Sequence, residues 1–292
     1  MKNDFLNGLL PLSLLALFSG CQTNSSLDGE IEESYQLAGN KFDGGKRVRQ
    51  TIHFDGIAGT LSSDAKPDLE KTQIDFSRYQ IIDEFDPSFE SGRKTSTNYH
   101  LVDDYSTARV KVGEGAIETS STSELRGYTF RGELIEKRWH YESMSQSASA
   151  PQRAALDAVI YHQRSAYPTS PMKIGTKWSH SPSFVNAFLR QEVRNVEGYV
   201  NLTLKKVEVI DGELSAVIGI ELLSSGDEVH EDGSVSLATI RLEGEAVVSL
   251  ETYLETELRL SGEMTGSVLQ YGMQNVYTSP IELTSRETYV ED

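Results

Sequence analysis

Residues 199–220 read YVNLTLKKVEVIDGELSAVIGI, and this stretch decides the fold class. Apolar side chains alternate with polar ones on both sides of Asp211 and Gly212, as they do in a β-strand with one buried face. Asp followed by Gly is the strongest short-range signal of a β-hairpin, because both central residues of a type I′ turn need a positive φ. The sequence therefore predicts two antiparallel strands joined at Asp211 and Gly212.

Further alternating segments lie on both sides of this hairpin. Downstream of it we expect strands over residues 235–242, 246–260, 267–277 and 281–290. Upstream of it the same alternation is found over residues 48–54, 74–82, 99–101 and 110–112. Apolar residues in these segments alternate with Glu, Thr, Ser or Arg, which is typical of antiparallel sheets that expose one face to water.

Two short helices are expected between the two groups of strands. Residues 150–165 have helical spacing of their apolar side chains and begin near a proline, and a shorter helix starts at Ser181. The prolines and glycine of residues 167–178 fix a crossing segment, and we expect Trp178 to be buried where it meets the sheet. The predicted fold is mainly β (α+β): a curved antiparallel sheet, or two β-rich halves, with one or two short helices packed across.

The chain begins with an apolar run that ends at its only cysteine, Cys21. This run is too short for a membrane-spanning helix, which needs about 20 apolar residues, so we interpret it as a cleaved leader. The residues that follow it are rich in Asn, Ser, Gly and Glu, and they contain few apolar side chains. We therefore predict a signal peptide over residues 1–20, a flexible linker over 21–42 and a β-rich envelope domain over 43–292.

The leader ends in Leu17, Phe18, Ser19, Gly20 and Cys21, which resembles the lipobox that signal peptidase II cleaves in bacterial lipoproteins. It departs from the family pattern at Phe18, where Leu is usual. The resemblance implies that Cys21 carries fatty acyl groups such as palmitate. It also implies the outer membrane, facing the periplasm or the cell surface, because the residue after the cysteine is not Asp. Two alternatives stay open: an ordinary free cysteine behind a plain signal peptide, and an uncleaved anchor.

The chain is strongly acidic, with 44 Asp and Glu against 27 Lys and Arg and a formal net charge of −17. A surface of this charge repels phosphate groups, which argues against binding to nucleic acid. Because Cys21 is the only cysteine, no disulfide within the chain stabilises the fold. We expect contact with the membrane through the acyl chains on Cys21.

The sequence contains no recognisable catalytic motif. The nucleophile motif Gly-x-Ser-x-Gly is absent. Ser170 and Lys173 have the Ser-x-x-Lys spacing, but Pro171 and Gly175 interrupt the helix that this motif requires. The six histidines form no His-x-x-x-His pair. We therefore expect neither enzymatic activity nor a metal or cofactor.

Five aromatic side chains are candidates for lining an apolar cavity, although ordinary core packing also accounts for them: Trp139, Tyr141, Trp178, Phe184 and Phe188. The crossing with Pro171, Gly175 and Trp178 resembles that of several uncharacterised bacterial lipoprotein families. The overall plan is similar to periplasmic lipoprotein carriers and mycobacterial lipid-binding lipoproteins. The resemblance implies a non-enzymatic protein that binds a lipid or other hydrophobic ligand. The alternatives are a structural or interaction subunit of an envelope complex, and an enzyme without a known motif.

Overall fold

The structure is a computed structural model of the chain, which is divided at residue 32 into two units, 1–32 and 33–292. The residues that it describes all belong to the second unit. They are 33–58, 62–63, 73–90, 93–112, 115–135, 138–143, 166–180, 194–229, 235–270 and 273–290. Everything below concerns these residues.

Long β-strands make up nearly all of the described chain. The first group comprises β1 (Ser34–Tyr35), β2 (Val48–Ala58), β3 (Ser62–Ser63), β4 (Gln73–Glu90), β5 (Arg93–Val112), β6 (Gly115–Thr122), β7 (Thr129–Ile135) and β8 (Arg138–Ser143). The second comprises β9 (Met172–Lys173), β10 (Lys177–His180), β11 (Arg194–Ile210), β12 (Glu213–Val229), β13 (Val235–Ser249), β14 (Glu255–Gln270) and β15 (Met273–Tyr289). The single turn η1 (Asp43–Gly45) is the only helix among the described residues.

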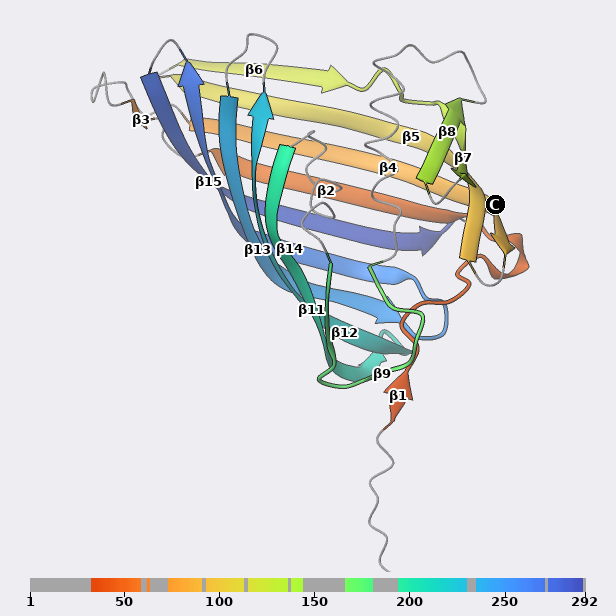
Figure 1. The fold of residues 1–292 in the computed structure, drawn as a ribbon. Coiled ribbons are helices and arrows are strands. Elements are labelled where there is room, and N and C mark those ends of the chain that lie inside the picture. The colour runs from red at the N-terminus through yellow and green to blue at the C-terminus, as the bar shows by residue number, and fades with distance from the viewer. Residues whose placement is uncertain are drawn as a thin grey trace, which may run out of the picture. The chain divides into compact units, whose positions relative to one another are not determined.

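These strands form one antiparallel sheet of 13 strands and a separate pair, β1 with β9. The main path of the sheet runs β10-β11-β12-β13-β14-β15-β2-β4-β5-β7-β8, and β3 and β6 pair with β15 and β5. Strand β15 pairs with β2, so the two groups of strands join in the middle of the sheet (Figure 1). The prediction of a curved antiparallel sheet is thereby confirmed, and the two β-rich groups of strands form the two parts of this one sheet.

The hairpin that decides the fold class has the predicted geometry. Ile210 lies opposite Glu213, so Asp211 and Gly212 are the only residues in the turn. Their φ angles are 53° and 89°, both positive as a type I′ turn requires. Residues 230–234 lie outside the described residues, and Val229 and Val235 on either side of them are paired.

One face of the sheet, here called the core face, carries the buried apolar side chains. Cross-strand pairing places one row of this face over eight strands: Leu204, Ile218, Ala246, Leu258, Ser285, Ile52, Gln80 and Asp104. The opposite face is polar and wet, and Lys205 and Glu245 form an exposed ion pair across it at 3.0 Å. This division is what alternation in the sequence predicts.

Two glycines on the core face allow neighbouring strands to approach more closely than other residues permit. A Cβ atom on Gly244 would lie 1.9 Å from the carbonyl oxygen of Arg259. A Cβ atom on Gly262 would lie 2.0 Å from that of Arg241. Both positions therefore require glycine, and they lie in β13 and β14, where the sheet bends strongly (Figure 1).

The predicted strand over residues 246–260 is wrong. Strand β13 runs through Gly244 to Ser249, and the chain turns over residues 250–254 before β14 begins at Glu255. Tyr253 has a positive φ of 59° in this turn. Gly244, which lies between the predicted strands 235–242 and 246–260, is inside β13 and allows the close approach to β14.

The folded unit begins earlier than the predicted boundary at Asp43. Residues 33–42, assigned to the linker from their composition, include Leu37, which is fully buried, and Phe42, which is 7% exposed. Strand β1 also pairs with β9. Apolar contacts made by a few well-spaced side chains therefore order a segment whose composition is that of a linker. The predicted helices over 150–165 and from Ser181 lie outside the described residues.

Among the described residues, no helix is both long and apolar enough to cross a membrane.

Candidate functional site

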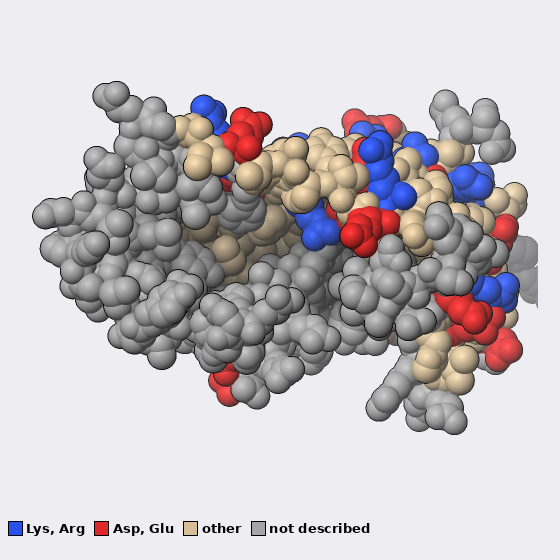
Figure 2. Space-filling model, turned by 90° about the horizontal axis from the view of Figure 1, so that it is seen from above, with Lys and Arg blue, Asp and Glu red and all other residues tan. Residues whose placement is uncertain are grey.

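The candidate site is the core face, on which an apolar area adjoins a polar one. The apolar cluster consists of buried side chains from β11, β12, β13, β14 and β15: Val200, Leu202, Leu204, Ala216, Ile218, Ile220, Leu222, Ile240, Leu242, Ala246, Val248, Leu258, Leu260, Ile281 and Leu283. Leu37, Tyr167 and Met172, from segments outside these long strands, pack on the cluster. In Figure 2 the molecule shows a hollow whose visible floor is neither acidic nor basic.

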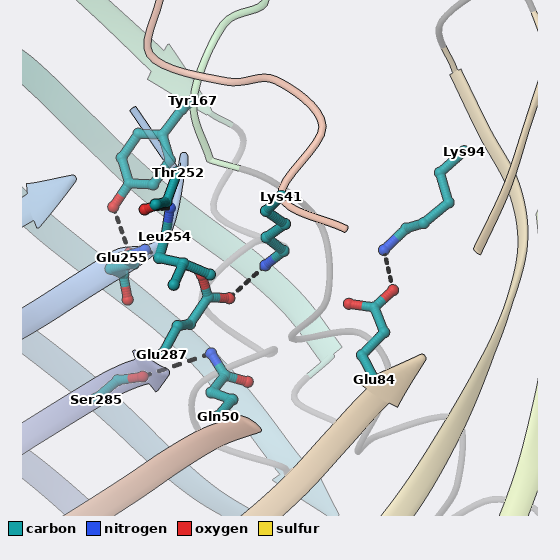
Figure 3. A network of polar contacts seen from close by, with 10 residues as sticks. All are labelled: Lys41, Gln50, Glu84, Lys94, Tyr167, Thr252, Leu254, Glu255, Ser285 and Glu287. Atoms are coloured by element: carbon teal, nitrogen blue, oxygen red, sulfur yellow. Dashed lines mark hydrogen bonds and ion pairs between the residues drawn. The ribbon is translucent and has the colours of Figure 1, made fainter. Parts of the chain in front are cut away.

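An ionic cluster lies at the end of this face, where the N-terminal segment crosses β15 (Figure 3). The Nζ atom of Lys41 lies 2.5 Å from Oε1 of Glu287, a side chain that is 8% exposed. The other oxygen of Glu287 accepts a hydrogen bond of 3.0 Å from the backbone N–H of Glu255. The hydroxyl of Tyr167 donates to Oε2 of Glu255. One carboxylate thus joins the N-terminal segment to the start of β14.

The charges of this cluster shift one another's pKa values. Burial, and then the charge of Glu287, raise the pKa of Glu255 from 4.5 to about 7. Burial and the charge of Glu255 raise the pKa of Tyr167 well above 10.0. Burial alone lowers the pKa of Lys41, but the carboxylates around it, with Glu287 foremost, outweigh this effect and raise it. Glu255 therefore exchanges its proton near neutral pH, while Lys41 stays charged.

A second ion pair extends the cluster to β4 and β5. Lys94 binds Oε1 of Glu84, which is 2% exposed, and Oε2 of Glu84 has no hydrogen-bond partner. Both lysines contact the ring of Phe42, whose centre is 5.8 Å from Nζ of Lys41 and 5.7 Å from Nζ of Lys94. The segment that precedes β2 is therefore held by charge and by an aromatic contact.

Gln80 lies on the core face in β4, next to Ile82, which belongs to a second buried apolar cluster with Tyr99, Leu101, Leu125 and Phe130. Its side chain is fully buried, and neither its amide nitrogen nor its oxygen has a hydrogen-bond partner. Its cross-strand neighbours are Ile52 on β2 and Asp104 on β5. Asp104 accepts two hydrogen bonds from Arg78, of 3.0 and 2.8 Å.

Only part of the predicted site is described. Trp178 lies on β10, where it is half-buried rather than fully buried, and its indole N–H donates a hydrogen bond of 2.9 Å to the carbonyl of Ala166. Its strand is at one end of the sheet path, and its side chain packs against the apolar cluster. Trp139 and Tyr141 belong to β8, opposite Leu134 and Gly132. Cys21, Phe184 and Phe188 lie outside the described residues.

The polar residues of the site were not predicted. Gln80 and Glu84 interrupt the apolar alternation of β4 on both sides of Ile82, and this interruption is the signal that the sequence offers. Within the described part of the chain, no group of three His, Cys, Asp or Glu residues has an arrangement that could hold a metal ion.

No protein-family model matches the chain, and no curated protein does. Among solved structures, a structure of lipid–protein interactions in lipovitellin matches with a TM-score of 0.39 and 11% identity. The match covers 86% of this chain and 25% of the lipovitellin chain, so this chain spans a quarter of that protein's length. The beta domain of the Bordetella autotransporter BrkA matches with a TM-score of 0.24 and 9% identity, over 82% of this chain and 99% of that one. Neither TM-score is high enough to support an argument about function.

Proposed function

We propose that this chain is a lipid-anchored protein of the cell envelope that holds a lipid or other hydrophobic ligand against the core face of its sheet. The anchor is the set of acyl groups expected on Cys21, and the outer membrane is the compartment that the lipobox resemblance favours. The proposal assigns no catalytic step to the chain. The observation that carries it is the apolar cluster, which extends without interruption over five strands.

The extent of this face supports a role in binding. Neighbouring strands are about 4.8 Å apart, so the row from Leu204 to Ser285 extends over roughly 19 Å. The described segments that cover it outside the long strands are short and extended, residues 33–42 and 166–180. Their few apolar contacts make them easier to displace than a second sheet would be.

A binding assay tests the proposal directly. The Cys21→Ser variant, produced from residue 21 onward so that it lacks both the apolar leader and the acyl acceptor, is purified without detergent and titrated with the fluorescent probe N-phenyl-1-naphthylamine. We expect saturable binding with an emission shift to shorter wavelength, because the probe enters an apolar environment. Extraction of the purified protein with organic solvent, followed by mass spectrometry, is expected to release a bound lipid.

Two matched variants locate the probe. Met264 packs against the apolar cluster on the core face, whereas Leu223 lies opposite Tyr199 and Arg241 on the wet face. Met264→Trp fills space on the core face and is expected to weaken probe binding several-fold. Leu223→Trp adds a similar volume on the other face and should leave binding unchanged. Absence of saturable binding to the Cys21→Ser protein would show that the proposed function is wrong.

An interaction subunit is the second candidate, and one observation favours it. Val209 and Leu214 lie directly opposite each other beside the Asp211-Gly212 turn, and they are 68% and 41% exposed. An exposed apolar pair at the tip of a long hairpin suits a protein contact. A photo-reactive residue at position 209 should then give one defined adduct in the envelope, and the same residue at the exposed position Glu221 should give none.

A further inference from the structure

The buried amide of Gln80 is the least satisfied polar group on the core face. Both of its polar atoms lack a partner while the side chain is fully buried. Such a group costs about 1 to 3 kcal/mol, so an unpartnered amide in a folded protein needs an explanation. An amide in this state has two N–H donors and one carbonyl acceptor available to a bound molecule.

Gln80 is a polar position on the core face between two apolar areas, because Ile82 of a second buried cluster lies next to it on the same face of β4 and pairs with Leu101. On one side it faces Ile52, which packs against the apolar cluster. On the other side it faces Asp104, whose carboxylate is bound by Arg78. A molecule with an apolar tail and a polar head therefore matches the face when its head lies at Gln80.

The nearby charges determine which head fits. Three cations of the described residues on this face are each bound to a carboxylate, Arg78 to Asp104, Lys41 to Glu287 and Lys94 to Glu84, whereas Lys46 lies over the ring of Tyr289. Glu255 adds a fourth carboxyl group. An anionic head would have to compete with these carboxylates for their cations, and it would be repelled by them. An uncharged head avoids this cost.

We infer that Gln80 binds the uncharged, hydrogen-bonding head of an amphiphile whose acyl chain lies along the core face from Ile52 to Leu258. This inference rests on the proposed function, and it names the class of ligand. Three strand spacings separate Gln80 from Leu258, roughly 14 Å. An acyl chain in one leaflet of a membrane extends over about 15 Å, half of the hydrocarbon core, so the lengths agree.

The test compares two amphiphiles with the same chain and different heads. N-phenyl-1-naphthylamine is displaced from the Cys21→Ser protein by monopalmitoylglycerol, which is uncharged, or by palmitate, which is anionic. We expect monopalmitoylglycerol to compete about tenfold better, because two hydrogen bonds to the amide form without an unpaired buried charge. Equal competition, or stronger competition by palmitate, would overturn the inference.

Two further variants show whether Gln80 makes this distinction. Gln80→Leu keeps the side-chain volume and removes the amide, so it should still bind the probe but lose the preference for monopalmitoylglycerol. Gln50→Leu is the matched control, because Gln50 faces the same side from β2 and its amide already donates to Ser285 at 3.4 Å. The control should keep the preference.

The outcomes separate this inference from the proposed function. If the Cys21→Ser protein binds no probe, both fail together. If it binds the probe and Gln80→Leu keeps the full preference, an internal water satisfies the amide and the inference alone fails. Gln80→Leu should also unfold at the same or a higher urea concentration, because it removes an unsatisfied polar group, so loss of folding does not obscure the result.

Discussion

The carboxyl group of Glu255 gives the protein a stability that depends on pH near neutrality. Its pKa rises from 4.5 to about 7 on folding, so the folded chain binds this proton more tightly than the unfolded chain. The contribution is complete below about pH 4.5 and is lost as the pH rises through 7. Each tenfold change in proton affinity corresponds to 1.36 kcal/mol, so the loss reaches about 3 kcal/mol. This figure is an upper limit, because the side chain keeps some contact with solvent.

Glu255→Gln tests this reasoning, because glutamine imitates the protonated carboxyl and still accepts the hydrogen bond of Tyr167. Urea unfolding of the Cys21→Ser protein, followed by circular dichroism from pH 5 to pH 8, measures the free energy of unfolding. The free energy of unfolding should fall less between pH 5 and pH 8 in the glutamine variant than in the parent protein, by up to about 3 kcal/mol. Glu257→Gln is the control, because Glu257 lies on the same strand and is 46% exposed. If the free energy of unfolding falls as steeply with pH in Glu255→Gln and in the control as in the parent protein, the proposed burial of Glu255 is wrong.

Three further predictions concern the anchor, the N-terminal segment and the edge of the sheet. Cys21→Ala removes the acyl acceptor, so labelling with palmitate should disappear and a longer precursor should accumulate; equal labelling of both proteins would contradict the lipobox. A protein that begins at Asp43 lacks Leu37, and loss of a buried leucine costs about 2 to 5 kcal/mol. It should unfold at lower urea than a protein that begins at Glu33, whereas equal midpoints would mean that the segment adds no stability. Trp178→Phe loses the hydrogen bond to Ala166 and should cost about 1 kcal/mol, and Trp178→Ala should cost more. Equal melting temperatures for the two variants would show that the ring makes no stabilising contact.

Local signals in the sequence predicted the parts of the fold that depend on neighbouring residues. The Asp211-Gly212 turn is one example, since its φ angles follow from the two residue types. The turn after β13 has no such sequence signal, because a side-chain hydroxyl group stabilises it by hydrogen bonds to the backbone. The Oγ atom of Ser249 accepts hydrogen bonds from the N–H groups of Glu251 and Thr252, at 3.3 and 3.2 Å. Serine is common in strands and turns alike, so its role here was not predictable.

The polar part of the site depends on residues that are distant in the sequence. Lys41 and Glu287 are 246 positions apart, and their pairing follows from the position of the N-terminal segment on β15. With 44 acidic residues in the chain, nothing in the sequence distinguishes a buried carboxylate such as Glu287 from an exposed one. The burial of Gln80 was also not predictable, because its neighbours on β2 and β5 follow only from the strand order of the sheet.

The pairing of β15 with β2 determines when the sheet can be completed. Val48 lies opposite Tyr289, so the middle of the sheet forms only after almost the whole described chain is available. Contacts of such long range slow folding, because a large loop must close before they form. Until then the edges of β2 and β15 remain without partners and can associate with other chains. If the chain is exported N-terminus first, as the proposed function requires, the edge of β2 that pairs with β15 stays exposed until β15 has crossed the membrane. We expect its yield to depend on holding chaperones in the compartment where it folds.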